Sequence, residues 1–335
     1  MRPTGALHFG HLVGALENWK QLQDQEYECF FMVADYHALM SEYEHPERIH
    51  HWSLDNVSDW LACGIDPDRS VIFRQSDVPE HAELFTLLSI ITPLGWLERV
   101  PTYKEQLREL AGRDLTTYGF LGYPVLQAAD ILLYRADVVP VGEDQLPHLE
   151  LTRELVRRFH ALFKTQLFPE PQPLLTDAPK LLGVDGRKMS KSYGNTIPLS
   201  ESPEAIRTTV QKMFTDPTRI KMTDPGHPET CNVCAYWKMF APERADAVWE
   251  ECRTAARGCA QNKRELAEVL VEHTEPFRAS PHRKPAHADG YHDGRDVEAI
   301  LQKGAQRARE EARKTMVEVK RVIGLVNPAQ TRLVY

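Results

Sequence analysis

Two short segments of the sequence carry residues that could act on a triphosphate. The first is Lys188-Met189-Ser190-Lys191-Ser192, in which two lysines and two hydroxyl groups stand in a glycine-flanked stretch. A cationic loop of this type can close over a triphosphate and neutralise the charge that builds on a departing pyrophosphate. A solvated basic turn is the alternative, but this five-residue string is rare by chance. The segment therefore predicts a catalytic role for Lys188 and Lys191.

The second segment is His8-Phe9-Gly10-His11, near the start of the sequence. Gly10 lets the backbone approach a phosphate closely, and the helix that follows points its positive N-terminus at the same place. The imidazoles of His8 and His11 can donate hydrogen bonds to phosphate oxygens. Two histidines in this position are usually surface residues, so the segment alone is a weak signal. Together with the lysine segment, it predicts a catalytic nucleotide site.

The hydrophobic pattern shows which elements must position these segments. Residues 29–34, 71–73 and 138–141 are apolar runs of strand length, and residues 12–22 and 149–163 show helical spacing. Polar residues follow the apolar runs, as at Arg74-Gln75-Ser76-Asp77. Strands with helices between them predict an α/β fold with a doubly wound, Rossmann-like parallel sheet. Ligands bind such sheets beyond the carboxyl ends of their strands, where these polar residues stand.

Strand-like runs fade beyond about residue 200, and long helical patterns replace them. We predict a Rossmann-like catalytic domain at residues 1–200, which includes the lysine segment. A helical domain follows at residues 201–325, and residues 326–335 form a tail.

Composition excludes several classes of protein. The chain has 335 residues, of which 42% are apolar and 26% charged, as in an ordinary soluble globular protein. No apolar run approaches the roughly 20 residues that cross a bilayer, and the first residues lack the apolar stretch of a secretory signal. We therefore expect a cytoplasmic protein with no membrane partner. A formal net charge of -8 argues against non-specific coating of nucleic acid, but it allows a basic patch for one RNA.

Four of the six cysteines fall in one short segment of the predicted helical domain. They are Cys231, Cys234, Cys252 and Cys259. Thiolates in this number suit tetrahedral zinc or an iron–sulfur cluster. Four reduced thiols are the alternative, because structural disulfides are rare in the cytosol.

Together, the histidine and lysine segments resemble those of class I aminoacyl-tRNA synthetases, and the chain is similar to their bacterial tryptophanyl branch over its whole length. The similarity is carried by residues 3–11, 64–67, 75–81, 128–134 and 139–145. The resemblance implies that ATP activates L-tryptophan as an adenylate, with Mg²⁺ accompanying the triphosphate, and that tRNA(Trp) accepts the acyl group. It also implies a homodimer.

The resemblance also implies roles for individual residues. ATP would be bound by residues of both segments and by one further aspartate: His8, Gly10, His11, Asp144, Lys188, Met189, Ser190, Lys191 and Ser192. The substrate ammonium would be held by Tyr123 and Gln145, with Gln127 assisting, and His37 would line the amino-acid pocket. Ordinary helix packing is the alternative for Tyr123 and Gln127.

The choice of amino acid rests on Asp130, which shares a helix face with Tyr123 and Gln127. A buried carboxylate could accept a hydrogen bond from an indole N–H, and a site built around that bond rejects analogues without it. A tyrosine hydroxyl can also donate, and Tyr-x3-Gln-x2-Asp is the pattern of the tyrosyl branch. A tyrosine–tRNA ligase is therefore one alternative, and a paralogue with an RNA-binding or regulatory role is another. Both histidines and both lysines are present, which argues against the paralogue.

Two further expectations come from the resemblance. Some members of the branch carry a [4Fe–4S] cluster whose first three cysteines correspond to Cys231, Cys252 and Cys259, while Asn262 stands at the fourth position. Cys234 could substitute, so we expect such a cluster, with zinc as the second choice. Members of the branch also have an apolar strand before the Pro-Thr-Gly turn. The sequence here begins inside the following loop, and we expect the true start to lie upstream.

Overall fold

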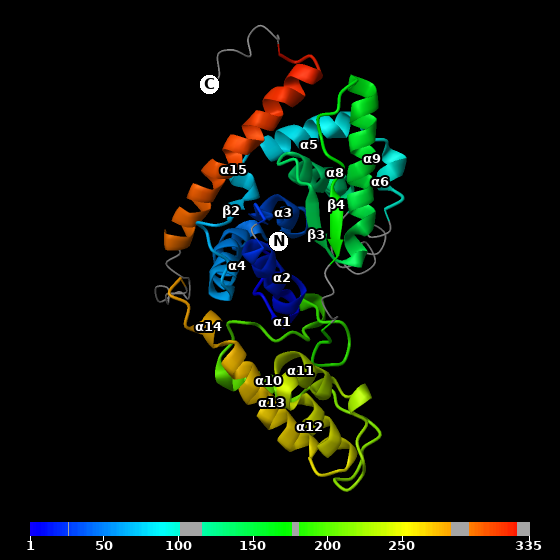
Figure 1. Ribbon diagram of the computed structural model, residues 1–335, viewed down its shortest axis with the longest axis vertical. Helices are drawn as coiled ribbons and strands as arrows, with labels where there is room; N and C mark the ends of the chain where they lie inside the picture. Colours follow the sequence, from blue (N-terminus) through cyan, green and yellow to red (C-terminus); the bar gives the residue numbers. More distant parts are fainter. Residues whose placement is uncertain (26, 101–115, 176–180, 283–294, 327–335) are drawn as a thin grey trace.

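The computed structural model describes residues 1–25, 27–100, 116–175, 181–282 and 295–326. These residues form a larger α/β body that contains the strands, with a smaller all-helical body at one end of it (Figure 1). The predicted α/β class with parallel strands and a helical C-terminal region is confirmed.

The described strands form two parallel pairs. Strand β1 (Phe30–Val33) pairs with β2 (Val71–Arg74), and β3 (Val138–Val141) pairs with β4 (Gln172–Leu175). In the register of the first pair, Phe30 stands opposite Val71, and in that of the second, Val138 stands opposite Gln172. The three apolar runs predicted as strands are confirmed, and their carboxyl ends carry the polar residues of the site.

Helices surround the strands in the larger body. The N-terminal helical segment consists of α1 (Phe9–His11), a π-helical turn (Leu12–Leu16) and α2 (Glu17–Asp24). The other helices of this body are α3 (Asp35–Glu42), α4 (Ile49–Cys63), α5 (Glu80–Ile91), α6 (Leu94–Leu97), α8 (Tyr118–Leu132) and α9 (Leu146–Phe163).

Local capping residues explain several helix ends. Helix α4 ends at Gly64, whose φ of 100° lies in the left-handed region that glycine adopts without strain. Helix α8 begins after Thr117, whose side chain accepts a hydrogen bond from the Phe120 amide. This cap sets where the helix begins that carries Tyr123, Gln127 and Asp130, the residues predicted to bind the amino acid.

The smaller body contains only helices among its described residues. They are α10 (Pro203–Gln211), α11 (Asn232–Phe240), α12 (Pro242–Arg253), α13 (Cys259–His273) and α14 (Glu275–Arg278). Helix α10 starts in the usual way, with Ser202 as the cap and Pro203 in the first turn.

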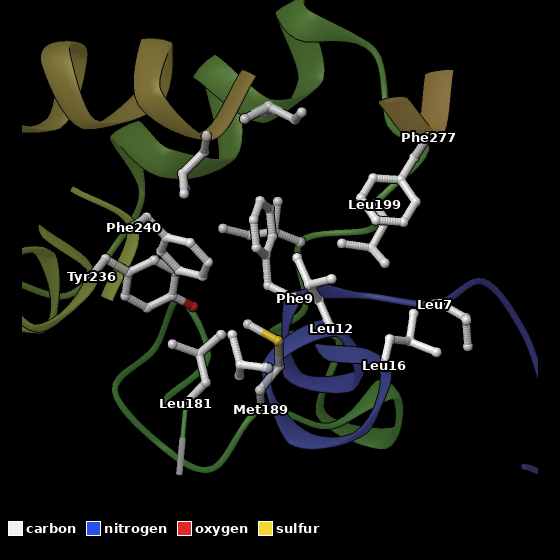
Figure 2. Packing of buried hydrophobic residues seen from close by; sticks show 14 of the residues in the cluster. Leu7, Phe9, Leu12, Leu16, Leu181, Met189, Leu199, Tyr236, Phe240 and Phe277 are labelled. Atoms are coloured by element: carbon white, nitrogen blue, oxygen red, sulfur yellow. The ribbon is translucent and has the colours of Figure 1, made fainter. Parts of the chain in front are cut away.

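One apolar core joins the N-terminal helical segment, the lysine segment and the helical body (Figure 2). Phe9, inside the histidine segment, meets Phe240 of α11 edge-on, with ring centroids 4.9 Å apart. Met189, inside the lysine segment, is buried in the same cluster beside Leu181. The histidine and lysine segments are therefore held relative to each other by packing that also involves the second body.

Helix α15 (Arg295–Val322) returns to the larger body, although it follows the helical domain in the sequence. It runs along this body against β2, α4 and α5 (Figure 1). Its cations pair with acids there: Lys303 with Asp68 at 2.8 Å, Lys320 with Glu83 at 2.7 Å, and Arg309 with Glu80 at 3.0 Å. Several basic side chains of this helix thus form ion pairs with acidic residues of the larger body.

A cavity of about 760 Å³ opens between β1 and β3, and both strands contribute to its lining. Met1 lies beside β1, where its ammonium group donates to the Met32 carbonyl (2.6 Å) and its carbonyl accepts from the Ala34 amide (2.9 Å).

Among the described residues, no helix is both long enough and apolar enough to span a membrane.

Candidate active site

The two histidines of the N-terminal segment cap the helix that they begin. His8 Nδ1 accepts a hydrogen bond from the Gly10 amide, and His11 Nδ1 accepts one from the His8 amide, both at 3.2 Å. Burial, followed by the nearby Lys191, lowers the pKa of His8 to about 4, and burial lowers that of His11 well below its usual value. Both rings are therefore neutral at pH 7, and each carries its proton on Nε2. That leaves two N–H donors for an anionic ligand.

The lysine segment lies against the same turn. Lys191 Nζ donates to the Gly5 carbonyl at 2.8 Å, across 186 residues of sequence. Burial, and then the neighbouring Arg2, lowers the pKa of Lys191 to about 8. Lys188 is exposed, whereas Met189 is buried. The structure thus brings Lys191 to the histidine segment and leaves Lys188 at the surface.

Asn195, which no motif in the sequence marked as functional, shapes the loop that carries the lysines. Its side chain accepts from the Ser190 amide (2.8 Å) and donates to the Lys188 carbonyl (3.1 Å) and to Asp185 (2.8 Å). Asn195 is 2% exposed, so these bonds are shielded from water. Its position next to Gly194, in a turn-rich stretch, is the feature of the sequence that could have indicated this role in the loop.

The amino-acid end of the site is centred on Asp130, whose side chain is 9% exposed. His37 of α3 donates through Nε2 to Asp130 Oδ2 at 2.8 Å. Oδ1 accepts from Gln75 Nε2 at 2.8 Å and from His81 Nδ1 at 2.7 Å. Burial alone would raise the pKa of Asp130, but the hydrogen bonds from His37 and His81 outweigh it and lower the pKa to about 2. Asp130 is therefore a carboxylate at neutral pH.

Gln75, His81 and Tyr134 were missed as members of this site. His81 Nε2 lies 2.8 Å from Tyr134 Oη, so the network runs from the cavity through Asp130 and His81 to Tyr134. Tyr134 follows Asp130 by four residues, a spacing that brings two side chains to the same side of a helical segment. This spacing could have indicated that Tyr134 lies near Asp130.

The remaining predicted residues for the amino acid also line the cavity. Tyr123, Gln127 and Gln145 are among its lining residues, together with His37 and Asp130. Tyr123 Oη lies 2.6 Å from Nε2 of His148, a buried histidine that the sequence analysis did not single out. Burial lowers the pKa of His148 to about 4, so this ring is neutral.

Asp144, predicted to bind the ATP ribose, is exposed and does not line the cavity. Its carboxylate accepts from Gln145 Nε2 at 3.2 Å. Both residues belong to the short turn after β3, at the carboxyl end of the strand. Asp144 thus lies at the edge of the cavity, between the lining residues Gly142 and Gln145.

Three of the four clustered cysteines are neighbours: Cys231 caps the start of α11, Cys234 lies in its first turn, and Cys252 lies at the end of α12. Cys231 hydrogen-bonds Cys234, which lowers the pKa of Cys231 to about 6, and Cys252 hydrogen-bonds Cys234 as well. Asn262 also contacts this group, with Nδ2 3.7 Å from the Cys234 sulfur. No set of three or more His, Cys, Asp or Glu side chains in the described parts of the chain is arranged to hold a metal ion. The predicted metal centre is therefore not supported and stays a prediction.

Comparison with known proteins places these features in context. Residues 1–275 match the family model described as tRNA synthetases class I (W and Y). The tryptophan–tRNA ligase of Thermotoga maritima is 50% identical over 328 residues, which cover 97% of this chain and 98% of that protein. The tryptophan–tRNA ligase of Ralstonia nicotianae is 41% identical, with 97% of each chain covered.

Solved structures of related synthetases are also similar to this chain. The crystal structure of tryptophanyl-tRNA synthetase from Campylobacter jejuni complexed with ADP and tryptophan superposes with a TM-score of 0.85 at 31% identity, covering 97% of this chain and 98% of that one. A tyrosyl-tRNA synthetase from Archaeoglobus fulgidus, with a TM-score of 0.64 at 22% identity, shares the fold.

Proposed function

The chain belongs to the class I aminoacyl-tRNA synthetases, in their tryptophanyl branch, and we infer from this premise that it is a tryptophan–tRNA ligase. The enzyme joins L-tryptophan to tRNA(Trp) at the expense of ATP, through an aminoacyl-adenylate, with release of AMP and diphosphate. The observation that carries this conclusion is the 50% identity to a tryptophan–tRNA ligase over nearly the full length of both chains.

For the activation step, we propose that the carboxylate of tryptophan attacks the α-phosphorus of MgATP in line, with pyrophosphate as the leaving group. This reaction needs no protein nucleophile, so catalysis depends on positioning and charge stabilisation. The Nε2–H groups of His8 and His11 are suited to donate to phosphate oxygens. Lys188 and Lys191 would neutralise the departing pyrophosphate, together with the backbone of Met189, Ser190 and Ser192.

For the amino acid, we propose that the indole N–H donates to Asp130. Tyr123 and Gln145 would bind the ammonium group with help from Gln127, and His37 would line the pocket. The support is their common place in the cavity lining and the ionised state of Asp130. Asp144 at the cavity edge is the proposed partner of the ATP ribose.

We also propose that the catalytic domain spans residues 1–200 and that residues 201–325 form the tRNA-binding part, with 326–335 as a tail. The exposed surface of α10 to α14 would contact the anticodon arm, while α15 braces the catalytic domain through its ion pairs. We expect the enzyme to act as a homodimer in the cytoplasm.

The cysteine group is proposed to bind a [4Fe–4S] cluster, with zinc as the second choice. Cys231, Cys234 and Cys252 already contact one another, and Cys259 lies within 4.0 Å of Arg219 Nη1 nearby. Such a centre would stabilise the helical body and take no part in activation. Iron and sulfide near four per chain in anaerobically purified protein are expected, and stoichiometric zinc or no metal would contradict the cluster.

ATP–pyrophosphate exchange, measured in parallel with tryptophan and with tyrosine, tests the function. We expect exchange with tryptophan alone. Exchange with tyrosine would move the enzyme to the sister branch, whose helix pattern Gln127 shares. No exchange with either amino acid would favour a paralogue with an RNA-binding role.

A further inference from the structure

The oxygens of Asp130 differ in how many hydrogen bonds they already accept. Oδ1 accepts two, from Gln75 and His81, and therefore uses both of its lone-pair positions. Oδ2 accepts one, from His37, and one position remains. Asp130 and His37 line the cavity, whereas Gln75 and His81 do not reach it. Only Oδ2 is thus available to a ligand in the cavity.

His81 is a fully buried donor to this carboxylate, as Gln75 is, and its ring is also packed against aromatic side chains. It is 0% exposed and stands in the first turn of α5, which follows β2 after a short 3-10 turn. Its ring lies at 26° to that of Phe73, with centroids 5.9 Å apart, and 5.4 Å from the ring of Tyr134. Ring stacking on Phe73 and a hydrogen bond at each ring nitrogen leave the imidazole little freedom to rotate.

The tautomer of His81 follows from its two partners. A carboxylate only accepts hydrogen bonds, so Nδ1 of His81 must carry a proton. Burial raises the pKa of Tyr134, so the phenol keeps its proton and donates to Nε2. Tyr134 is in turn stacked against Phe30 of β1, with centroids 4.7 Å apart. Two strands and two helices therefore fix the direction of the N–H that meets Asp130.

We propose that His81, supported by Tyr134, is a positioning residue that determines the requirement for an indole N–H. This proposal rests on the role of Asp130 in the proposed function. By occupying Oδ1, His81 prevents the carboxylate from turning, so that Oδ2 points into the cavity at one depth. A ligand without an N–H at that depth leaves the second acceptor position of a desolvated carboxylate oxygen unfilled, which is costly.

The test uses pyrophosphate exchange with tryptophan and with β-(3-benzothienyl)alanine, which replaces the indole N–H with sulfur. In His81→Leu, the KM for tryptophan should rise roughly tenfold, and the preference for tryptophan over the analogue should fall by a similar factor. The KM for ATP should not change. In His81→Asn, the amide nitrogen can take the place of Nδ1, and most of the preference should return.

Two further variants complete the series. Tyr134→Phe should shift the preference in the same direction as His81→Leu but by less, because only the support of the tautomer is lost. His45→Leu, at a side chain that is 81% exposed, should behave as the wild type. A wild-type preference in His81→Leu, or equal losses for tryptophan and ATP in every His81 variant, would overturn the proposal.

Asp130→Leu, which removes both acceptor oxygens, separates this inference from the proposed function. If Asp130→Leu leaves the preference for tryptophan unchanged, the assignment of Asp130 as the indole acceptor is wrong, and so is the positioning role. If Asp130→Leu removes the preference while His81→Leu and Tyr134→Phe retain it, the acceptor is right and only the role of His81 is wrong.

Discussion

At the scale of single residues, the protonation states of the histidine and lysine side chains decide which groups can donate hydrogen bonds to an anionic ligand. His8 and His11 are neutral because they are buried and lie near Lys191, and their Nδ1 atoms are used by the backbone. Their remaining N–H groups are therefore directed donors. Lys191, by contrast, has a pKa of about 8, close to working pH, so its charge is sensitive to small changes.

We predict an alkaline limb in the activity that arises from Lys191. As the pH rises through about 8, Lys191 loses its proton, and the kcat/KM for ATP in pyrophosphate exchange should fall about tenfold per pH unit. Lys191→Arg keeps its charge because the guanidinium pKa exceeds about 12. The fall should then move to higher pH. A wild-type profile that stays flat to about pH 10 would contradict the prediction.

Tyr123 should contribute to tryptophan binding through its hydroxyl. Its Oη lies 2.6 Å from His148 Nε2 at the cavity wall. Tyr123→Phe removes a hydrogen bond to a charged ligand group, so the KM for tryptophan should rise roughly tenfold while the KM for ATP stays unchanged. Tyr118→Phe is the matched control on the same helix, because Tyr118 is 68% exposed. Equal effects of the two variants would rule out the assigned role.

At the scale of elements, the close contact between α15 and β2 depends on one glycine. A Cβ at Gly304 would overlap the carbonyl of Ile72, so only glycine lets the helix lie this near the strand. The ion pairs of α15 with Asp68, Glu80 and Glu83 then hold it in place.

Gly304→Ala should therefore destabilise the protein. Overpacking of this kind costs about 1–3 kcal/mol, and the melting temperature should fall by several degrees in calorimetry. Gly14→Ala is the control, since a Cβ there meets no atom within 4 Å, and it should be neutral or slightly stabilising. Equal melting temperatures for Gly304→Ala and the wild type would show that the contact relaxes without cost.

On the scale of the whole molecule, the helical body holds the base of the catalytic loop. Tyr236 of α11 donates to the Leu182 carbonyl at 2.7 Å, and Asn232 donates to the Gly183 carbonyl at 2.7 Å. Both side chains are buried, and both bonds cross between the two bodies. We therefore expect the second body to influence the activation step through the position of this loop.

Tyr236→Phe tests this connection. Loss of one buried hydrogen bond costs about 1 kcal/mol, so the KM for ATP should rise about fivefold, with the KM for tryptophan unchanged. Stopped-flow or exchange kinetics would measure it, with Tyr118→Phe again as the exposed control. An unchanged KM for ATP would mean that the loop holds its position without the second body.

The features that could be read from the sequence are those encoded within short stretches. The strand runs, the helix that carries Tyr123 to Asp130 and the parallel α/β class depend on local pattern, and the structure agrees with these predicted elements. The phosphate-binding role of the histidine and lysine segments was also inferred from local pattern, and it stays a prediction. Apolar periodicity and the placement of glycines are properties of residues that are close in sequence. The elements that depend on them can therefore be predicted from the sequence alone.

The remaining features depend on contacts between distant residues. Asp130 takes its three donors from positions 37, 75 and 81, the cations of α15 pair with acids at positions 68, 80 and 83, and Lys191 meets Gly5 across 186 residues. The direction of each bond, the tautomer of each histidine and the return of α15 to the first body follow from how elements pack. No local pattern encodes that packing, because it is the outcome of burial across the entire chain.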